Sequence, residues 1–163
     1  MDPQVEAGGL GSEDPGVSDT VTWRVGDKWV YAGAFDPTVL VQDAGVDAVV
    51  GTITGDATTT VDAVSEVNID GVPTLVYETS SKADFDKGGV ALEGYTGNLF
   101  IQFQVDEVRR VSDLAKLSTD LSLNVRYVPY GISSLTQQIA DITISTTYDP
   151  MSENYDFPLR IGE

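Results

Sequence analysis

Residues 116–127 alternate strictly between two kinds of side chain, and this run constrains the fold more than any other part of the chain. One set of alternate positions is mostly apolar, and it consists of Leu117, Thr119, Leu121, Leu123, Val125 and Tyr127. The positions between them are polar or charged. Successive strand residues point to opposite faces of a sheet, so the pattern predicts a long strand with one apolar and one polar face. Such strands are typical of antiparallel sheets, which often leave one face in water.

Shorter runs of the same kind predict further strands on the N-terminal side. Residues 21–25 and 28–32 alternate around a turn at Gly26-Asp27. Two β-rich runs meet at Asp70-Gly71, a dipeptide that tolerates the positive φ of a tight hairpin turn. Just after it, Leu75 and Tyr77 are predicted on one face and Val76 on the other.

Two more strands are predicted around residues 83–105, separated by glycine turns at Gly88-Gly89 and at residues 94–97. Residues 142–148 alternate as well. The segment 105–116 fits helical spacing and also an extended chain, and an extended conformation is expected because both neighbours are β.

Together, these segments predict seven to nine strands, mostly antiparallel, with at most one or two short helices. Residues 38–44 are the candidate helix, because Asp36-Pro37 is a common helix start and Gly45 a common end, although a loop also fits. We therefore predict an all-β or β-rich α+β fold, built as a strongly curved antiparallel sheet or half-barrel. A β-sandwich is the alternative, since strand spacing alone does not separate the two.

The domain organisation follows from composition. Residues 1–19 are rich in glycine and acids and have few large apolar side chains, which predicts a flexible acidic leader or linker. An N-terminal strand that adds to a neighbour's sheet is the alternative. Residues 20–158 are predicted to form a single β domain, and residues 159–163 are interpreted as the start of a following repeat.

Charge and residue usage exclude several classes of function. The chain has 26 acidic and 9 basic residues and a formal net charge of −17, so neither nucleic acid nor an anionic membrane is an expected partner. It has no cysteine and no histidine, which removes thiol nucleophiles, histidine-based triads and the usual zinc sites. No transmembrane segment and no signal peptide are recognisable. No catalytic motif is found, and no enzymatic activity is expected.

Two groups of residues are candidate binding sites. The apolar faces of the long strands would line the concave side of a curved sheet, where a hydrophobic ligand could lie. These candidate ligand-binding residues are Leu99, Ile101, Phe103, Leu117, Leu121, Leu123, Val125 and Tyr127. Near the C-terminus, Asp149, Glu153 and Asp156 offer oxygen ligands for calcium, although their spacing matches no EF-hand loop. A polar crossover loop is the alternative there, and no other cofactor is predicted.

Aromatic and basic residues offer two further candidate sites. Trp23, Trp29 and Tyr31 could form a platform on which a sugar ring stacks, but the pattern favours a place in the core. The pair Arg109-Arg110 could clamp an anion, or it could neutralise neighbouring acids such as Asp106 and Glu107.

Two sequence segments together resemble a known pattern. "WRVGDKWVY" (residues 23–31) resembles the opening of secreted and lipid-anchored domains of archaea and bacteria. "YDFPLRIGE" (residues 155–163) is similar to the closing phrase of a repeat in large surface proteins of marine planktonic archaea. The opening is also distantly similar to the half-barrels of lipoprotein carriers, from which this chain differs in its low helix content.

The resemblance implies a secreted or cell-surface setting and neighbouring domains of the same polypeptide as partners. The first expectation is thus a non-enzymatic extracellular domain with a structural or adhesive role. The alternatives are a carrier that binds a lipid-like ligand in the concave face of the sheet, and a glycan-binding module.

Overall fold

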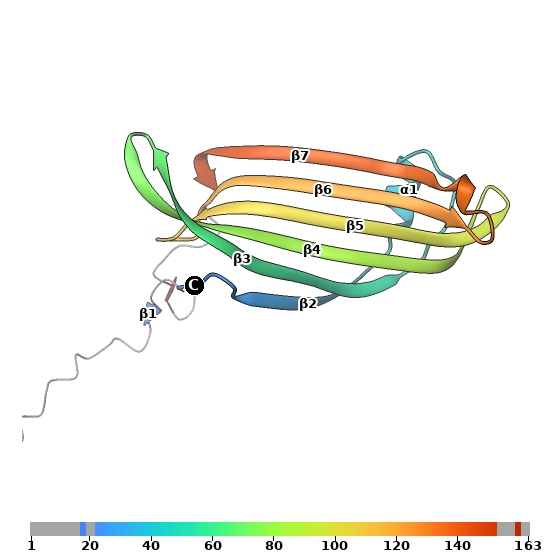
Figure 1. The fold of residues 1–163 in the computed structure, drawn as a ribbon, viewed down its shortest axis with the longest axis horizontal. Coiled ribbons are helices and arrows are strands. Elements are labelled where there is room, and N and C mark those ends of the chain that lie inside the picture. The colour runs from blue at the N-terminus through green and yellow to red at the C-terminus, as the bar shows by residue number, and fades with distance from the viewer. Residues whose placement is uncertain (1–16, 19–21, 153–158, 161–163) are drawn as a thin grey trace, which may run out of the picture.

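A computed structural model describes residues 17–18, 22–152 and 159–160. Its main body is one six-stranded antiparallel sheet, in which each strand pairs with the next one along the chain (Figure 1). The strands are β2 (Lys28–Phe35), β3 (Ile53–Ile69), β4 (Val72–Leu92), β5 (Tyr95–Arg110), β6 (Lys116–Pro129) and β7 (Gln137–Ser152). A 3-10 turn, η1 (Ser133–Leu135), joins β6 to β7. Two short strands, β1 (Val17–Ser18) and β8 (Leu159–Arg160), pair with each other.

The predicted fold class is confirmed: the chain is β-rich and antiparallel, with a curved sheet that does not close into a barrel. The strand predicted from the alternation of residues 116–127 is β6. Its apolar side faces the curved interior of the sheet, which we call the inner face. The predicted leader and the predicted repeat start lie mainly outside the described residues.

Tight turns join the long strands, at Asp70-Gly71 as predicted and at Glu93-Gly94 rather than over residues 94–97, since residues 95–97 already belong to β5. Asp70 and Gly71 have φ of 53° and 84°, and Glu93 and Gly94 have φ of 50° and 82°. These values place both residues of each two-residue turn in the left-handed region, which matches the twist of the flanking strands.

The turn predicted at Gly88-Gly89 is wrong. Residues 72–92 form one strand, and the pairing of β4 with β5 shifts register between Lys87 and Val90. The extra residue is absorbed by a bulge in which Gly89 has φ of 75°. Glycine provides positive φ equally well for a turn and for a bulge, so the sequence signal was the same for both.

Two other predicted extended segments are also corrected. Residues 22–25 form no strand, whereas the predicted turn is present over residues 24–27: Asp27 N–H donates to the Arg24 carbonyl at 2.9 Å, and Arg24 N–H donates to Asp27 Oδ2 at 2.7 Å. Beyond Arg110, residues 111–115 form the connection between β5 and β6. In it Leu114 N–H donates to the Arg110 carbonyl at 2.9 Å, and Leu114 takes φ of 59°.

The predicted short helix is present as α1 (Thr38–Asp43). Asp36 Oδ1 accepts a hydrogen bond from Thr38 N–H at 2.9 Å, which satisfies a donor at the start of the helix. The helix and the loop after it cover one end of the inner face. Their buried residues Val41, Ala48 and Val50 share a core cluster with residues of the sheet.

The inner face has two separate clusters of buried apolar side chains. The larger one lies under α1 and includes the sheet residues Ile53, Val90, Leu92, Leu99, Ile101, Val125 and Tyr127. The smaller one joins Val61, Tyr77 and Leu114, with Trp23 and Trp29 packed against it. The opposite, outer face is polar along the middle of the strands, as at Asp84, Gln102 and Asn124.

Candidate functional site

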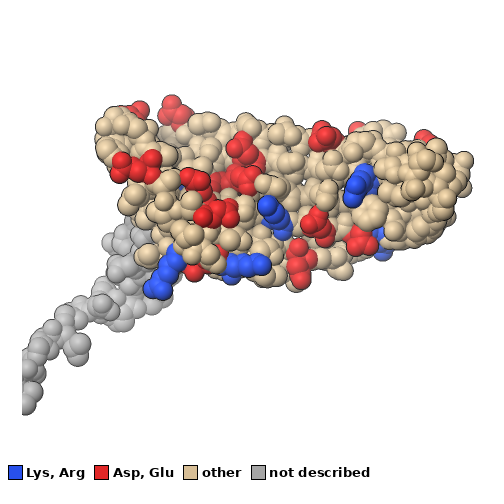
Figure 2. Space-filling model, viewed as in Figure 1, with Lys and Arg blue, Asp and Glu red and all other residues tan. Residues whose placement is uncertain are grey.

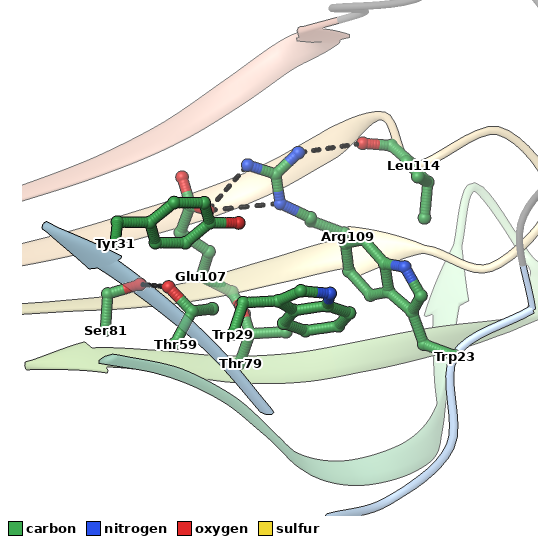
Figure 3. A pocket seen from close by; sticks show the side chains of 9 residues that line it. All are labelled: Trp23, Trp29, Tyr31, Thr59, Thr79, Ser81, Glu107, Arg109 and Leu114. Carbon is green, nitrogen blue, oxygen red and sulfur yellow. Dashed lines mark hydrogen bonds and ion pairs between the residues drawn. The ribbon is translucent and has the colours of Figure 1, made fainter. Parts of the chain in front are cut away.

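A pocket of about 280 Å³ lies on the inner face, next to the smaller cluster (Figure 3). One wall is aromatic and consists of Trp23, Trp29 and Tyr31. The rest is mainly polar and comes from β3, β4, β5 and the connection after β5. These lining residues are Thr59, Thr79, Ser81, Glu107, Arg109 and Leu114. The pocket thus combines ring surfaces with hydroxyl, carboxylate and guanidinium groups.

The aromatic wall is positioned by strand geometry and by one buried hydrogen bond. Trp29 and Tyr31 are two residues apart in β2 and therefore share its inner face. Trp23 lies in the segment before β2, where its backbone N–H donates to Tyr77 Oη at 3.0 Å. The ring centroid of Trp23 is 5.1 Å from that of Trp29 and 5.2 Å from that of Tyr77. These contacts fix Trp23, whereas Tyr31 is 57% exposed.

Hydroxyl groups line the adjoining part of the sheet. Thr59 and Ser81 stand opposite each other on β3 and β4, and their hydroxyl oxygens are 2.7 Å apart (Figure 3). Thr79 is 5% exposed, and its hydroxyl donates to the Glu107 carbonyl at 3.4 Å. These hydroxyls are held by protein partners and keep lone pairs for further hydrogen bonds.

Three charged side chains form a group beside the pocket: Glu107 and Arg109 of β5 line it, and Lys116 of β6 contacts Glu107. Glu107 Oε2 accepts hydrogen bonds from Arg109 Nε at 3.1 Å and Arg109 Nη2 at 2.6 Å. Glu107 Oε1 lies 2.6 Å from Lys116 Nζ. Arg109 Nη1 also donates to the Leu114 carbonyl at 3.4 Å. With two cations and one anion, this group is locally positive in a strongly acidic protein.

The pKa of Glu107 reflects two opposing effects. Burial of the carboxylate raises the pKa and is the largest single effect. The hydrogen bonds and charges of Lys116 and Arg109 together outweigh it, so the pKa of Glu107 lies below its usual value. Glu107 is therefore ionised at neutral pH.

The sequence prediction for the basic pair is partly confirmed. Arg109 does neutralise Glu107, but Arg110 pairs with Asp113, to which its Nε donates at 2.8 Å. Glu107 and Arg109 were not predicted to border a pocket. Their spacing of two residues was the available signal, because it places both side chains on one face of a strand.

Seven of the eight residues predicted to line the concave face lie on the inner side of β5 and β6, whereas Leu117 is the extra residue at a register shift of β6. The eight fall into two environments. Leu99, Ile101, Val125 and Tyr127 are buried in the cluster under α1. Phe103, Leu117, Leu121 and Leu123 are only partly buried.

Toward β7 the inner face is less covered. Ile142 and Ile144 pair with Leu123 and Leu121, and they are 37% and 52% exposed. We call this partly exposed group, Phe103, Leu121, Leu123, Ile142 and Ile144, the apolar strip.

The predicted calcium ligands are only partly within the described residues. Asp149 lies in β7 and is exposed, whereas Glu153 and Asp156 lie outside the described residues. Within the described part of the chain, no three acidic residues gather in a way that could hold a metal ion. The described helices include none that is long and apolar enough to cross a membrane. Figure 2 shows acidic side chains spread over the face in view, with fewer basic ones among them.

Comparison with known proteins gives no relative. No protein-family model matches the chain, and no curated protein or solved structure is significantly similar to it.

Proposed function

We propose that this chain is a non-enzymatic binding module of a secreted or cell-surface protein, and that its pocket holds a single neutral sugar ring. A sugar ring has an apolar face and a rim of hydroxyl groups, so it needs both an aromatic surface and hydrogen-bonding groups. The observation that carries the proposal is the wall of Trp23, Trp29 and Tyr31 beside fixed hydroxyls and a guanidinium in one pocket.

The size and chemistry of the pocket narrow the ligand class. Its volume of about 280 Å³ is just below the usual range for small-molecule sites, which suits one ring rather than a chain. Glu107 already accepts from two cations, so it is a poor partner for an additional ammonium group. Arg109 is in turn engaged by Glu107, which reduces its attraction for a carboxylate. A neutral sugar fits these conditions best.

The same groups support binding rather than hydrolysis. Glycoside hydrolysis uses two carboxyl groups on opposite sides of the bond that breaks, and one of them must be protonated. Glu107 is the one acidic residue among those that line this pocket. Its lowered pKa makes it a weak candidate for the protonated acid.

The pocket provides its own spectroscopic probe. The chain has two tryptophans, Trp23 and Trp29, and both belong to the aromatic wall. A sugar that enters the pocket should change the tryptophan fluorescence and shift the indole N–H signals in NMR spectra. Titration with a panel of neutral methyl glycosides at millimolar concentration tests this directly. No change with any member of the panel would contradict the proposal.

A matched pair of variants connects the signal to the wall. Tyr31→Ala removes an exposed ring from the pocket and should weaken binding about tenfold, which corresponds to about 1.4 kcal/mol. Val30→Ala is the control, because Val30 is the neighbouring residue of β2, is 60% exposed and does not line the pocket. Equal affinity of the two variants would show that the ligand binds elsewhere.

A second candidate function is transport of a lipid-like ligand, and one observation favours it. The apolar strip leaves Ile142 and Ile144 partly exposed on the inner face of a curved sheet. Native mass spectrometry of gently purified protein should then detect a co-purified lipid. Loss of that lipid in Leu121→Asp, with retained sugar binding, would separate this function from the first.

A further inference from the structure

Both edges of the six-stranded sheet are without a partner strand among the described residues. The sheet order runs from β2 to β7, so β2 and β7 each pair on one side only. An unpaired edge presents a row of backbone N–H and C=O groups that can extend the sheet by binding another strand.

The edge of β7 lacks most of the features that block strand addition. It has 16 residues and contains no lysine or arginine, and its two acids, Asp141 and Asp149, enclose a run of seven uncharged residues. Pairing with β6 is regular from Ala140 to Thr147, so no bulge interrupts this stretch. Lysines, prolines, bulges and very short length are the usual protections of an edge, and residues 142–147 of β7 have none of them. Pro150 and a register shift lie beyond this stretch, toward the end of the strand.

We propose that β7 of one molecule binds β2 of a second copy of this chain. All neighbours in the sheet are antiparallel, so β2 and β7 of one copy run in opposite directions. A second copy whose β2 pairs with β7 of the first copy therefore continues the same antiparallel strand order.

One register between the two strands matches charge and size. It places Lys28, the single charged residue of β2, opposite the exposed Asp149, which lies just beyond Thr147, where the pairing of β7 with β6 shifts register. On the inner face it places Trp29 opposite Tyr148 and Phe35 opposite Ile142. The eight residues of β2 then cover residues 142–149 of β7, which include the whole uncharged run. Aromatic and opposite-charge pairs across strands are the contacts that stabilise such a pairing.

The exposure of these side chains is consistent with a partner on each edge. Tyr31 and Phe35 of β2 are 57% and 39% exposed, and Ile144 and Ile142 of β7 are 52% and 37% exposed. Addition of a strand would extend the apolar strip onto the aromatic residues of the next copy. Tyr148 of one copy would then lie beside Trp29 of the other, next to its pocket. The proposal does not depend on what the pocket binds.

The geometry also predicts how assembly depends on conditions. Two different surfaces meet, so each added copy leaves one β2 edge and one β7 edge open, and the assembly grows as a filament or closes as a ring. Each copy carries a formal charge of −17, and the copies repel one another at low salt. Because salt screens this repulsion over about 10 Å at 0.1 M, assembly should increase with both protein and salt concentration. Sedimentation velocity measures both dependences.

Cysteine cross-linking tests the contact and its register together, because the native chain has no cysteine. In the proposed register Ala32 lies opposite Ser145, and both are exposed. Oxidation of Ala32→Cys/Ser145→Cys should give a ladder of covalent dimers, trimers and larger species on a non-reducing gel. The control is Ala32→Cys/Asp141→Cys, in which the second position is four residues, or about 13 Å, away along β7. No ladder, or equal ladders for both pairs, would overturn the proposal.

Charge reversal tests the same register without a covalent bond. Lys28→Glu and Asp149→Lys should each weaken assembly about fivefold, since each places like charges opposite one another. The double variant should restore assembly, because the pair is then present with its signs exchanged. Ser122→Lys on the outer face of β6 is the control for a change of net charge. Failure of the double variant to recover would contradict the register, and a monomer under all conditions would contradict the contact itself.

Discussion

Two glycines within strands, Gly97 of β5 and Gly33 of β2, differ sharply in the space around them, and this difference gives a quantitative prediction. A Cβ added at Gly97 would lie 2.3 Å from the Val128 carbonyl oxygen and 2.8 Å from Pro129 Cα. It would also lie 2.7 Å from Cζ of Tyr127, whose hydroxyl donates to the carbonyls of Val90 and Tyr95 at 3.2 and 2.8 Å. Two of these three contacts are with backbone, which cannot rotate away.

The expected cost of Gly97→Ala follows from these contacts. Overpacking of a dense core costs about 1 to 3 kcal/mol. Displacement of Tyr127 would lose the hydrogen bond of its single hydroxyl proton, which the two carbonyls share and which contributes about 1 kcal/mol. The free energy of unfolding should therefore fall by about 2 to 4 kcal/mol.

Gly33→Ala is the matched control, because Gly33 is also a strand glycine and the nearest atom to its added Cβ is the Gly55 carbonyl oxygen at 3.9 Å. It should change the free energy of unfolding by less than about 1 kcal/mol, and a small gain is expected from the lower entropy of the unfolded chain. Urea unfolding followed by circular dichroism measures both variants. A cost below about 1 kcal/mol for Gly97→Ala, or equal costs for the two variants, would refute the reasoning.

Two further predictions concern the pocket. Glu107 has a lowered pKa in the folded state, so it contributes stability that is present above its unfolded pKa of about 4.3 and is lost as the pH falls through the folded value. Glu107→Gln should therefore be less stable than the native protein at pH 7, and the difference should shrink as the pH falls below the unfolded pKa, as thermal unfolding across pH measures. A constant difference at all pH values would argue against the ion group. Tyr77→Phe removes the acceptor of the Trp23 backbone N–H, so the free energy of unfolding should fall by about 1 to 3 kcal/mol. Acrylamide should also quench the tryptophan fluorescence more strongly in this variant. Unchanged quenching would mean that this hydrogen bond does not hold the aromatic wall.

The alternation of side chains predicted which face of a strand each residue occupies, but not what covers that face. Leu99 and Ile144 lie on the same inner face, yet they are 1% and 52% exposed. The difference arises because α1 and its loop cover one end of the sheet and not the other. Similarly, Tyr77 is 2% exposed beside Trp23, whereas Leu75, two residues earlier, is 53% exposed. The segments that cover each face are distant in sequence from the strands, so the local alternation of side chains does not predict them.

The pocket escaped prediction for the same reason. Its aromatic wall comes from residues 23–31 and its charged group from residues 107–116, and six-stranded pairing is needed to bring them to one face. The sequence showed the spacing of Trp29 and Tyr31 and of Glu107 and Arg109, but not that the two pairs share a pocket. The favoured interpretation of the tryptophans as core residues agrees with the contact of Trp23 and Trp29 with the smaller cluster. The same two side chains also line the pocket, so the two interpretations were not exclusive.

The charged group beside the pocket is difficult to explain by stability alone. The side chains of Glu107 and Arg109 are 14% and 15% exposed, so both have lost most of their water. The free energy lost when two charges leave water is about as large as the free energy gained from their attraction. Well-packed apolar residues would usually stabilise the same buried position as well or better. The neighbouring inner face demonstrates that alternative, since β5 and β6 supply Leu99, Ile101 and Val125 to the core a few residues away. The ion group adjoins the pocket that Trp23, Trp29 and Tyr31 also line, and this position is consistent with the proposed binding of a polar ligand.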